Sequence, residues 1–177
     1  MVKVRIFSVV LCLAMFANFG VSAAETTKYK IAFLGGRNTI EFTEIEGQDG
    51  EAIVVNMFSS KRPNGGKIYV DRYEPEGGSV PKIASVFVNG YAPRKLFVIV
   101  DWAADVSSIG TGGTLYQVYV YDEKVENREK LTRLIPDAVL MNRFGVGFDG
   151  TREGKRVIYR FKTAKSVKKQ LADWGYK

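Results

Sequence analysis

Three glycines in the stretch FGVGFDG, residues 144–150, have the spacing G-x-G-x-x-G of a dinucleotide-binding loop. In such a loop the glycines join a parallel strand to a helix whose N-terminus meets the pyrophosphate. Here the segment that follows, KRVIYRFK at residues 155–162, places Val157, Tyr159 and Phe161 at alternate positions, which predicts a strand instead. We therefore interpret the glycines as a turn-forming connector into a final strand, and we expect no cofactor.

The other side chains of this connector are expected to divide between core and surface. Phe144 and Phe148 are large and apolar, so we expect both to enter the core on either side of the turn. Asp149 precedes a glycine, as turn-capping aspartates often do. We interpret Asp149 as a turn residue first and as a site residue only second.

Nucleophilic catalysis has few candidate residues in this chain. Histidine is absent, and the single cysteine, Cys12, lies in an N-terminal apolar run. These absences remove the usual general base at neutral pH, the Ser-His pair and the thiolate metal sites. Ser166 and Lys169 fit the S-x-x-K spacing of penicillin-binding enzymes, but the partner motifs Ser-Asp-Asn and Lys-Thr-Gly are missing. A lysine-rich helix face accounts for that match without chemistry.

Carboxylates are the remaining route to hydrolysis. Asp101, Asp105, Asp122 and Asp149 lie near the ends of expected strands or in loops. A glycosidase needs two carboxyl groups held about 5 to 10 Å apart, and nothing in the sequence marks one pair over another. No D-x-D-x-D-G run is present to bind calcium. We therefore expect no enzyme and no metal, and a carboxylate-dependent hydrolase is the last of three alternatives.

The N-terminus has the layout of a secretory signal peptide. Lys3 and Arg5 precede an apolar run, and Val21-Ser22-Ala23-Ala24 supplies small residues for cleavage after Ala23 or Ala24. The apolar run is shorter than the ~20 residues of a membrane-spanning helix. We expect residues 1–23 to be a cleaved signal peptide, the remainder to be periplasmic, and no transmembrane anchor to stay with it.

Residues 24–177 are expected to form a single β-rich domain. Its formal charge is +5, because the chain's +7 includes Lys3 and Arg5. A moderate positive charge favours anionic partners, although ordinary solubility explains it equally well. Nucleic acid is not expected as a partner, since no binding motif for it is recognisable.

Alternating apolar residues separated by turn signals predict a series of strands. The expected strands are residues 28–34, 39–45, 52–58, 67–73, 83–88, 95–102, 114–122 and 155–162. The segments KLFVIVDW and TLYQVYVYD, residues 95–102 and 114–122, are apolar on both faces, so they should be central and pair as antiparallel neighbours. The fold class is therefore mainly β (α+β), an antiparallel sandwich or partly open barrel.

Two segments carry helical patterns. Residues 124–134 have a thin apolar face. The C-terminal segment is better defined, because Ala164, Val167, Leu171 and Trp174 recur on one face after a capping Thr163. Gly175 follows where a helix C-terminus favours glycine. We expect this amphipathic helix to pack on the sheet.

The stretch between the two central strands, residues 103–113, predicts a long glycine-rich loop. Long ordered loops on rigid hairpins often bind partners, although a flexible connection has the same composition. The candidate partner-binding residues are Asp105, Ser107, Ser108, Thr111, Tyr119 and Tyr121. Tyrosines 69, 73, 119 and 121 fit an exposed binding face or the core equally well, whereas Tyr116 fits the core better.

The segments IASVFVNGYAPRKLFVIVDW and GGTLYQVYVYD, within residues 83–122, resemble one unit of the FG-GAP or VCBS type. The resemblance implies a strand, a turn, an apolar strand and a glycine-rich hairpin. Turns of that family carry calcium-binding aspartates, and the turn here is Asn89-Gly90-Tyr91-Ala92-Pro93-Arg94, so calcium binding does not carry over. The overall layout is similar to small periplasmic inhibitor and immunity proteins of bacteria.

By elimination we expect a non-catalytic binding protein, an inhibitor or immunity-type protein that neutralises a toxin or an envelope enzyme. The alternative is an envelope-associated structural module that binds an anionic cell-wall polymer. The residues expected to carry that alternative are Lys61, Arg62, Arg152, Lys155 and the lysines of the C-terminal helix, Lys165, Lys168 and Lys169.

Overall fold

The computed structural model describes residues 24–47, 50–59, 66–90, 93–123 and 131–176. The expected signal peptide, Lys61, Arg62 and residues 124–130 of the first expected helix lie outside these ranges. In the described part of that helix, residues 131–134, the chain is extended and forms an isolated bridge at Arg133, so no helix is present there.

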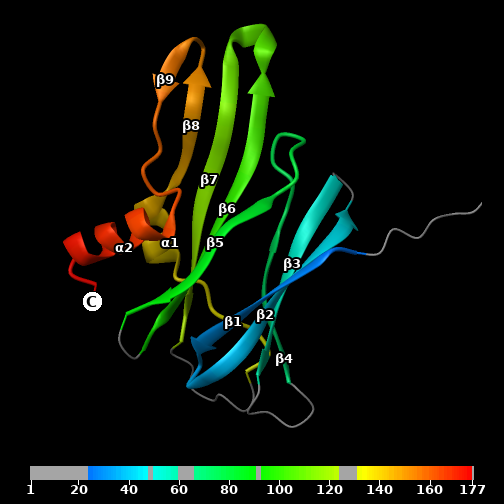
Figure 1. Cartoon of the computed structure of the whole chain (residues 1–177), viewed down its shortest axis with the longest axis vertical. Coiled ribbons are helices and arrows are strands. Elements are labelled where there is room, and N and C mark those ends of the chain that lie inside the picture. The colour runs from blue at the N-terminus through cyan, green and yellow to red at the C-terminus, as the bar shows by residue number, and fades with distance from the viewer. Residues whose placement is uncertain (1–23, 48–49, 60–65, 91–92, 124–130, 177) are drawn as a thin grey trace, which may run out of the picture.

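Two antiparallel sheets make up the body of the protein (Figure 1). The first contains four strands in chain order, β1 (Thr26–Phe33), β2 (Gly36–Gly47), β3 (Gly50–Ser59) and β4 (Lys67–Tyr73). The second contains five, β5 (Lys82–Asn89), β6 (Lys95–Val106), β7 (Thr111–Asp122), β8 (Val146–Arg152) and β9 (Lys155–Val157). The mainly β, antiparallel fold class is confirmed.

The second sheet has a buried core on each of its faces. Leu96, Val98 and Val100 of β6 pack into a cluster shared with β1–β4. Phe97 and Ile99 of the same strand pack into a separate cluster with the two helices. Because successive residues of a strand point to opposite faces, a strand apolar at every position is buried on both. The layers are therefore sheet, sheet and helices.

The helices are α1 (Ala138–Phe144) and α2 (Ala164–Asp173). The side chain of Asp137 caps α1 by accepting from the backbone N–H of Leu140 at 3.0 Å. Thr163 and Ser166 form a capping box at the start of α2, and Val167 and Leu171 face the sheet. The expected C-terminal helix and its cap are confirmed.

An extended segment, residues 131–137, closes one side of the sandwich. The backbone of Tyr69 on β4 donates to Thr132 O at 2.8 Å and accepts from Leu134 N at 2.9 Å. Further along, Asp122 N donates to Ile135 O and Asp137 N donates to Val120 O, so the segment also pairs with β7. The edge of β4 is therefore covered, and the two sheets are joined on that side.

Two expectations about connections are wrong. The stretch expected as a long loop, residues 103–113, mostly continues the strands β6 and β7 around a short 3-10 turn, η2 (Ser107–Ile109). The stretch expected as a glycine connector is itself strand β8, while the strand expected over residues 155–162 is reduced to Lys155–Val157. In both places some of the glycines that signal turns occupy strands instead, namely Gly112, Gly113, Gly147 and Gly150.

Candidate binding surface

The hairpin of β6 and β7 is paired along its whole length. The register runs from Lys95 opposite Asp122 to Val106 opposite Thr111, and Gly110 has a φ of +63° in the turn. The small residues of this stretch suggested a loop because Gly112 and Gly113 weaken a strand signal. Ladder pairing with β6, and with Thr151 and Gly150 of β8, outweighs that local preference.

The end of the β6–β7 hairpin extends beyond the end of the neighbouring strand β5 (Figure 1). The ladder between β5 and β6 ends at Lys82 opposite Asp101, whereas β6 continues to Val106. On the other side, β8 and β9 support β7 up to Gly112. The turn of β8 and β9 is tied to the tip, because Gly154 N donates to Gly110 O at 3.1 Å and Glu153 N to the hydroxyl of Thr111 at 3.1 Å.

Two large apolar side chains are exposed at the tip. Val106 is 48% exposed and Ile109 is 57% exposed. Asp105 and Ser108 are also exposed, and Thr111 is partly buried. Ser107 begins the turn, and its side chain lies outside the described part. The structure thus brings Asp105, Ser108 and Thr111 together with two apolar residues that the sequence did not single out.

Tyr121 does not share this surface, because it is completely buried. Its hydroxyl donates to Asp71 Oδ2 at 2.6 Å and lies 3.0 Å from the hydroxyl of Tyr73, also fully buried. Burial raises the pKa of both phenols well above the ordinary tyrosine value. These groups link β4 to β7 across the sandwich, so the expectation of Tyr121 as a partner anchor is withdrawn.

A β-bulge explains how Asp71 reaches Tyr121. Asp71 lies opposite Val55 and Tyr69 opposite Asn56, so Val70 has no partner and β4 carries an extra residue. An extra residue in a strand turns the side chains that follow it to the opposite face of the sheet. The carboxylate of Asp71 consequently meets the interior hydroxyls, a position that alternation of side chains would not predict.

The remaining tyrosines are divided between core and surface. Tyr119 is partly buried, with its ring centre 4.5 Å from that of Tyr73, and burial raises its pKa to about 12. Tyr69 is partly exposed beneath the guanidinium of Arg133, 5.2 Å from its ring centre. Tyr116 is also only partly buried, and its ring stacks on Tyr159.

The candidate carboxylates occupy different environments. Burial raises the pKa of Asp101, and this outweighs the opposing charge of Lys82. Asp149 is held by an ion pair and hydrogen bond from Lys162, which lower its pKa. Asp149 lies within β8, so its expected turn-capping role is wrong. Asp122 pairs with Lys95 at 2.9 Å, at the opposite end of the hairpin from Asp105.

No candidate metal centre emerges within the described ranges, where no three His, Cys, Asp or Glu side chains gather closely enough to hold an ion. Lys95 instead lies between two carboxylates, Asp122 at 2.9 Å and Asp137 at 2.8 Å. The three groups connect the ends of β6 and β7 to the start of α1. Their arrangement is that of two structural ion pairs that share Lys95.

Each glycine of the dinucleotide-like pattern has a separate structural cause. Gly145 ends α1 with a φ of +66°, a conformation that favours glycine. At Gly147 a Cβ would stand 1.8 Å from the ring of Tyr159, so the ring packs directly against the backbone of Gly147. At Gly150 a Cβ would stand 2.6 Å from the Cα of Gly113 on β7. Gly147 and Gly150 therefore serve packing and Gly145 serves a helix end, and the expected burial of Phe144 and Phe148 is confirmed.

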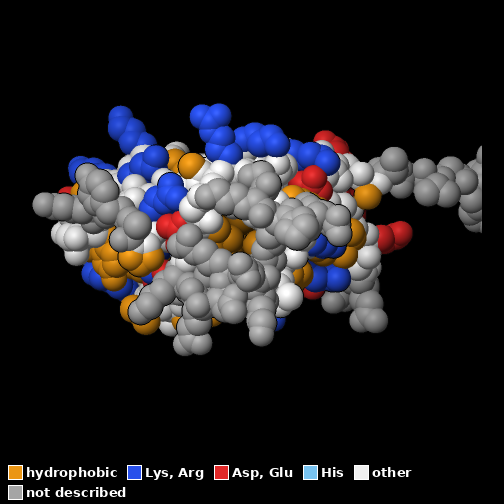
Figure 2. Space-filling model, turned by 90° about the horizontal axis from the view of Figure 1, so that it is seen from below, with side chains coloured by type: hydrophobic (Ala, Val, Ile, Leu, Met, Phe, Trp, Pro, Cys, Tyr) orange, Lys and Arg blue, Asp and Glu red, His pale blue; other side chains and the backbone are white. Residues whose placement is uncertain are grey.

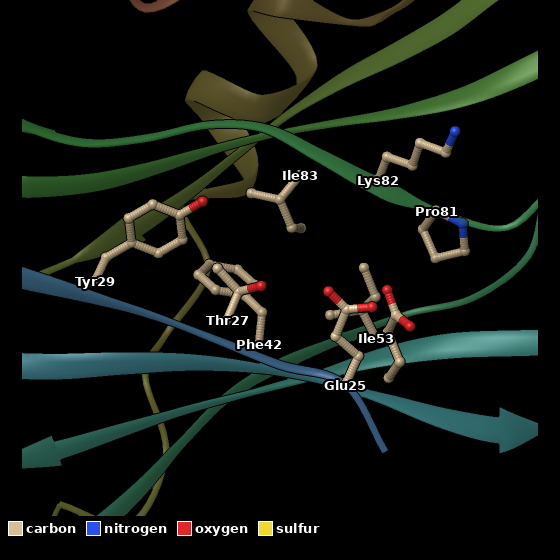
Figure 3. Close-up of a pocket in the computed structure, with 9 residues that line it drawn as sticks. Glu25, Thr27, Tyr29, Phe42, Ile53, Pro81, Lys82 and Ile83 are labelled. Carbon is tan, nitrogen blue, oxygen red and sulfur yellow. The ribbon is translucent and has the colours of Figure 1, made fainter. Parts of the chain in front are cut away.

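A second feature is the seam where the edge strands β1 and β5 face each other. Near one end of the seam a hollow of about 160 Å³ has Phe42, Ile53 and Ile83 in its wall and Glu25 and Glu44 among its lining. Figure 3 shows Ile83 reaching from β5 toward the side chains of the first sheet. Near the other end, Lys30, Ile31 and Ala32 border two larger and more open hollows.

Comparison with known proteins gives no relative: no family model, no curated protein and no solved structure matches this chain. Within the described residues, neither helix combines the length and the apolar character needed to cross a membrane.

Proposed function

We propose that this protein is an exported, non-catalytic binding protein that uses the tip of the β6–β7 hairpin to contact another protein. The supporting observation is the exposure of Val106 and Ile109 at the end of a fully paired, projecting hairpin. Apolar side chains presented on a rigid support lose little conformational entropy on binding. An inhibitor or immunity protein that inserts this tip into a toxin or envelope enzyme is the most concrete form.

The partner can be identified by placing a photo-crosslinking residue at Ser108, which is exposed beside Ile109. The affinity of the purified pair is then measured for the double variant Val106→Ser with Ile109→Ser. Because central apolar contacts dominate interfaces, we expect about a 30-fold or larger loss of affinity, and loss of inhibition if the partner is an enzyme.

The matched control is Val139→Ser with Ile158→Ser. These residues are 69% and 67% exposed but lie on α1 and in the segment after β9, away from the tip. The control should bind like the unmodified protein. Equal losses in both double variants, or no loss in either, would remove the hairpin tip as the binding surface.

The alternative of a polymer-binding module has one supporting observation. Arg152, Lys155 and Arg156 are exposed on the β8–β9 hairpin, next to the tip. If this alternative holds, the protein co-sediments with purified cell wall, binding falls steeply with salt, and Lys155→Glu weakens it. Binding that Val106 and Ile109 control and that salt leaves unchanged supports the protein-binding proposal instead.

A further inference from the structure

The hollow of about 160 Å³ near one end of the seam is lined by two carboxylates at core-facing positions. In β1 the odd-numbered Ile31 and Phe33 are buried between the sheets, and Glu25 has the same parity just before the strand. Glu44 lies opposite the core residue Ile53, and its backbone N–H donates to Glu25 O at 3.0 Å. Alternation of side chains in a sandwich would place apolar residues at these positions.

Within the described part of the chain, no Lys or Arg pairs with either carboxylate. Lys82 also lines the hollow, but it lies opposite Asp101 in the ladder of β5 and β6. Figure 3 shows the side chain of Lys82 directed away from Glu25. Lys28 of β1 pairs with Glu41 at 2.7 Å. Like charges on neighbouring strands destabilise a sheet, so a cation from outside would relieve this repulsion.

The other walls of the hollow are mainly apolar and aromatic. Phe42, Ile53 and Ile83 form much of the lining, and the ring of Tyr29 meets that of Phe42 edge to face with centres 5.7 Å apart. Tyr29 is 39% exposed, so part of its surface is open to a ligand. An apolar cavity of about 150 Å³ is known to hold one benzene molecule. The hollow therefore has room for one short aliphatic chain.

This acidic hollow differs from the rest of the molecule, which is basic. The chain has 26 Lys and Arg against 19 Asp and Glu, and Figure 2 shows basic side chains gathered along one border of the face seen from below. At physiological ionic strength, exposed charges more than about 8 Å apart are largely screened from each other. The two nearby carboxylates therefore act on a cation in the hollow more strongly than the net charge does.

We propose that this hollow binds a primary alkylammonium group, carried by a lysine side chain of a partner protein or by a free aliphatic amine. The ammonium lies between Glu25 and Glu44, and its methylene chain covers Phe42 and Ile83. The aromatic rings add attraction for the cation. A bare Ca²⁺ ion fits less well, because it takes about six to eight oxygen ligands and the described lining is mostly carbon.

The test follows the methyl resonances of Ile53 and Ile83 by NMR while n-pentylammonium is added to the purified protein. We expect saturable shifts at millimolar concentration. The neutral analogue n-pentanol should bind at least about tenfold more weakly, because it has the same chain without the charge. A peptide with one lysine between glycines distinguishes the two sources. Tighter binding than n-pentylammonium assigns a partner's lysine, and binding no tighter assigns a free amine.

The double variant Glu25→Gln with Glu44→Gln should weaken the binding of n-pentylammonium at least about tenfold. Because it removes two like charges from neighbouring segments, its thermal midpoint should stay the same or rise. The matched control is Glu46→Gln with Glu51→Gln. These exposed residues also lie opposite each other, on β2 and β3, but outside the lining of the hollow. The control should bind n-pentylammonium like the unmodified protein.

Four results would overturn the proposal: no shift at millimolar n-pentylammonium, equal binding of n-pentanol, equal weakening in both double variants, or binding only after the α-amino group of the chain is blocked. The first would leave the carboxylates as charges that deter pairing at the edge of β1. The last would show that the α-amino group itself fills the hollow. The lining includes no residue of the hairpin tip, so Val106→Ser with Ile109→Ser should bind n-pentylammonium normally. Failure of either proposal can therefore be recognised independently.

Discussion

Glu123 is the clearest case of a single side chain that holds several elements together. It is 2% exposed, and its carboxylate accepts from the backbone N–H of Gly35 at 3.0 Å and of Arg94 at 2.8 Å. It also accepts from the guanidinium of Arg94. Burial alone would raise the pKa of Glu123, but these hydrogen bonds outweigh burial and lower it.

We predict that Glu123→Gln lowers the free energy of unfolding by about 3 kcal/mol, because the cationic Arg94 loses its buried partner. Glu41→Gln, which breaks the more exposed pair with Lys28, should cost less than about 1 kcal/mol. Urea unfolding at pH 7 measures both variants. Similar values for the two would contradict the role given to Glu123.

The lowered pKa of Glu123 also determines how the stability of the fold changes with pH. Its folded-state pKa lies below the unfolded value, so its stabilising contribution is complete above the unfolded pKa and is lost as pH falls through the folded pKa. The stability difference between the unmodified protein and Glu123→Gln should therefore shrink below about pH 4.3. Urea midpoints between pH 3 and 7 check this, and a constant difference would count against it.

The hydroxyl pair of Tyr73 and Tyr121 joins the two sheets through Asp71. Tyr121→Phe removes the hydroxyl that contacts the buried Tyr73 hydroxyl and donates to Asp71 Oδ2, while Asp71 still accepts from the backbone N–H of Arg72, so we expect a loss of about 1 to 3 kcal/mol. The double variant with Tyr73→Phe should lose less than the sum of the two single variants, because the groups share one network. Additive losses in thermal unfolding would show that the hydroxyls act separately.

At the scale of elements, strand β8 depends on glycine for the packing of Tyr159. In Gly147→Ala the new methyl group would overlap the tyrosine ring, so the ring must move from its place against Tyr116. We predict a destabilisation of about 2 kcal/mol and a changed near-ultraviolet circular dichroism spectrum. Gly112→Ala is the control, since it has open space and no left-handed φ. An equal effect of both substitutions would refute this packing argument.

The two central strands show what local patterns predict well. KLFVIVDW and TLYQVYVYD predicted two doubly buried, antiparallel neighbours, and β6 and β7 are confirmed as such. The helix after Thr163 was predicted equally well, because its cap and apolar spacing are local features. The β6–β7 connection was predicted wrongly. Its glycines favour a loop when only the local sequence is considered, but pairing with a neighbouring strand holds them in β7.

At the scale of the whole molecule, the two cores lie on opposite faces of the same strands. The chain has two tryptophans, and each reports on one core: Trp102 packs between the sheets and Trp174 against the helices. Because β6 and β7 contribute to both cores, neither core can lose its packing without disturbing strands that support the other. The domain should therefore unfold cooperatively.

We predict that Trp102→Phe and Trp174→Phe, each of which retains one tryptophan, unfold with the same midpoint by fluorescence as by far-ultraviolet circular dichroism. The remaining tryptophan reports one core, and the dichroism reports the strands, so agreement in both variants indicates a single transition. Different midpoints within either variant would show that the helical layer separates from the sandwich first.

The sequence by itself determined the fold class, the central strands, the C-terminal helix and the absence of histidine chemistry. These depend on composition and on spacing between near neighbours in the chain. Tertiary structure decided which tyrosines are buried, which carboxylates are paired and why Gly147 and Gly150 are required. Those properties depend on strand register and on a bulge in β4, which bring together residues such as Asp71 and Tyr121 from separate sheets. Local patterns do not encode such pairings, because they form only when the sheets pack against each other.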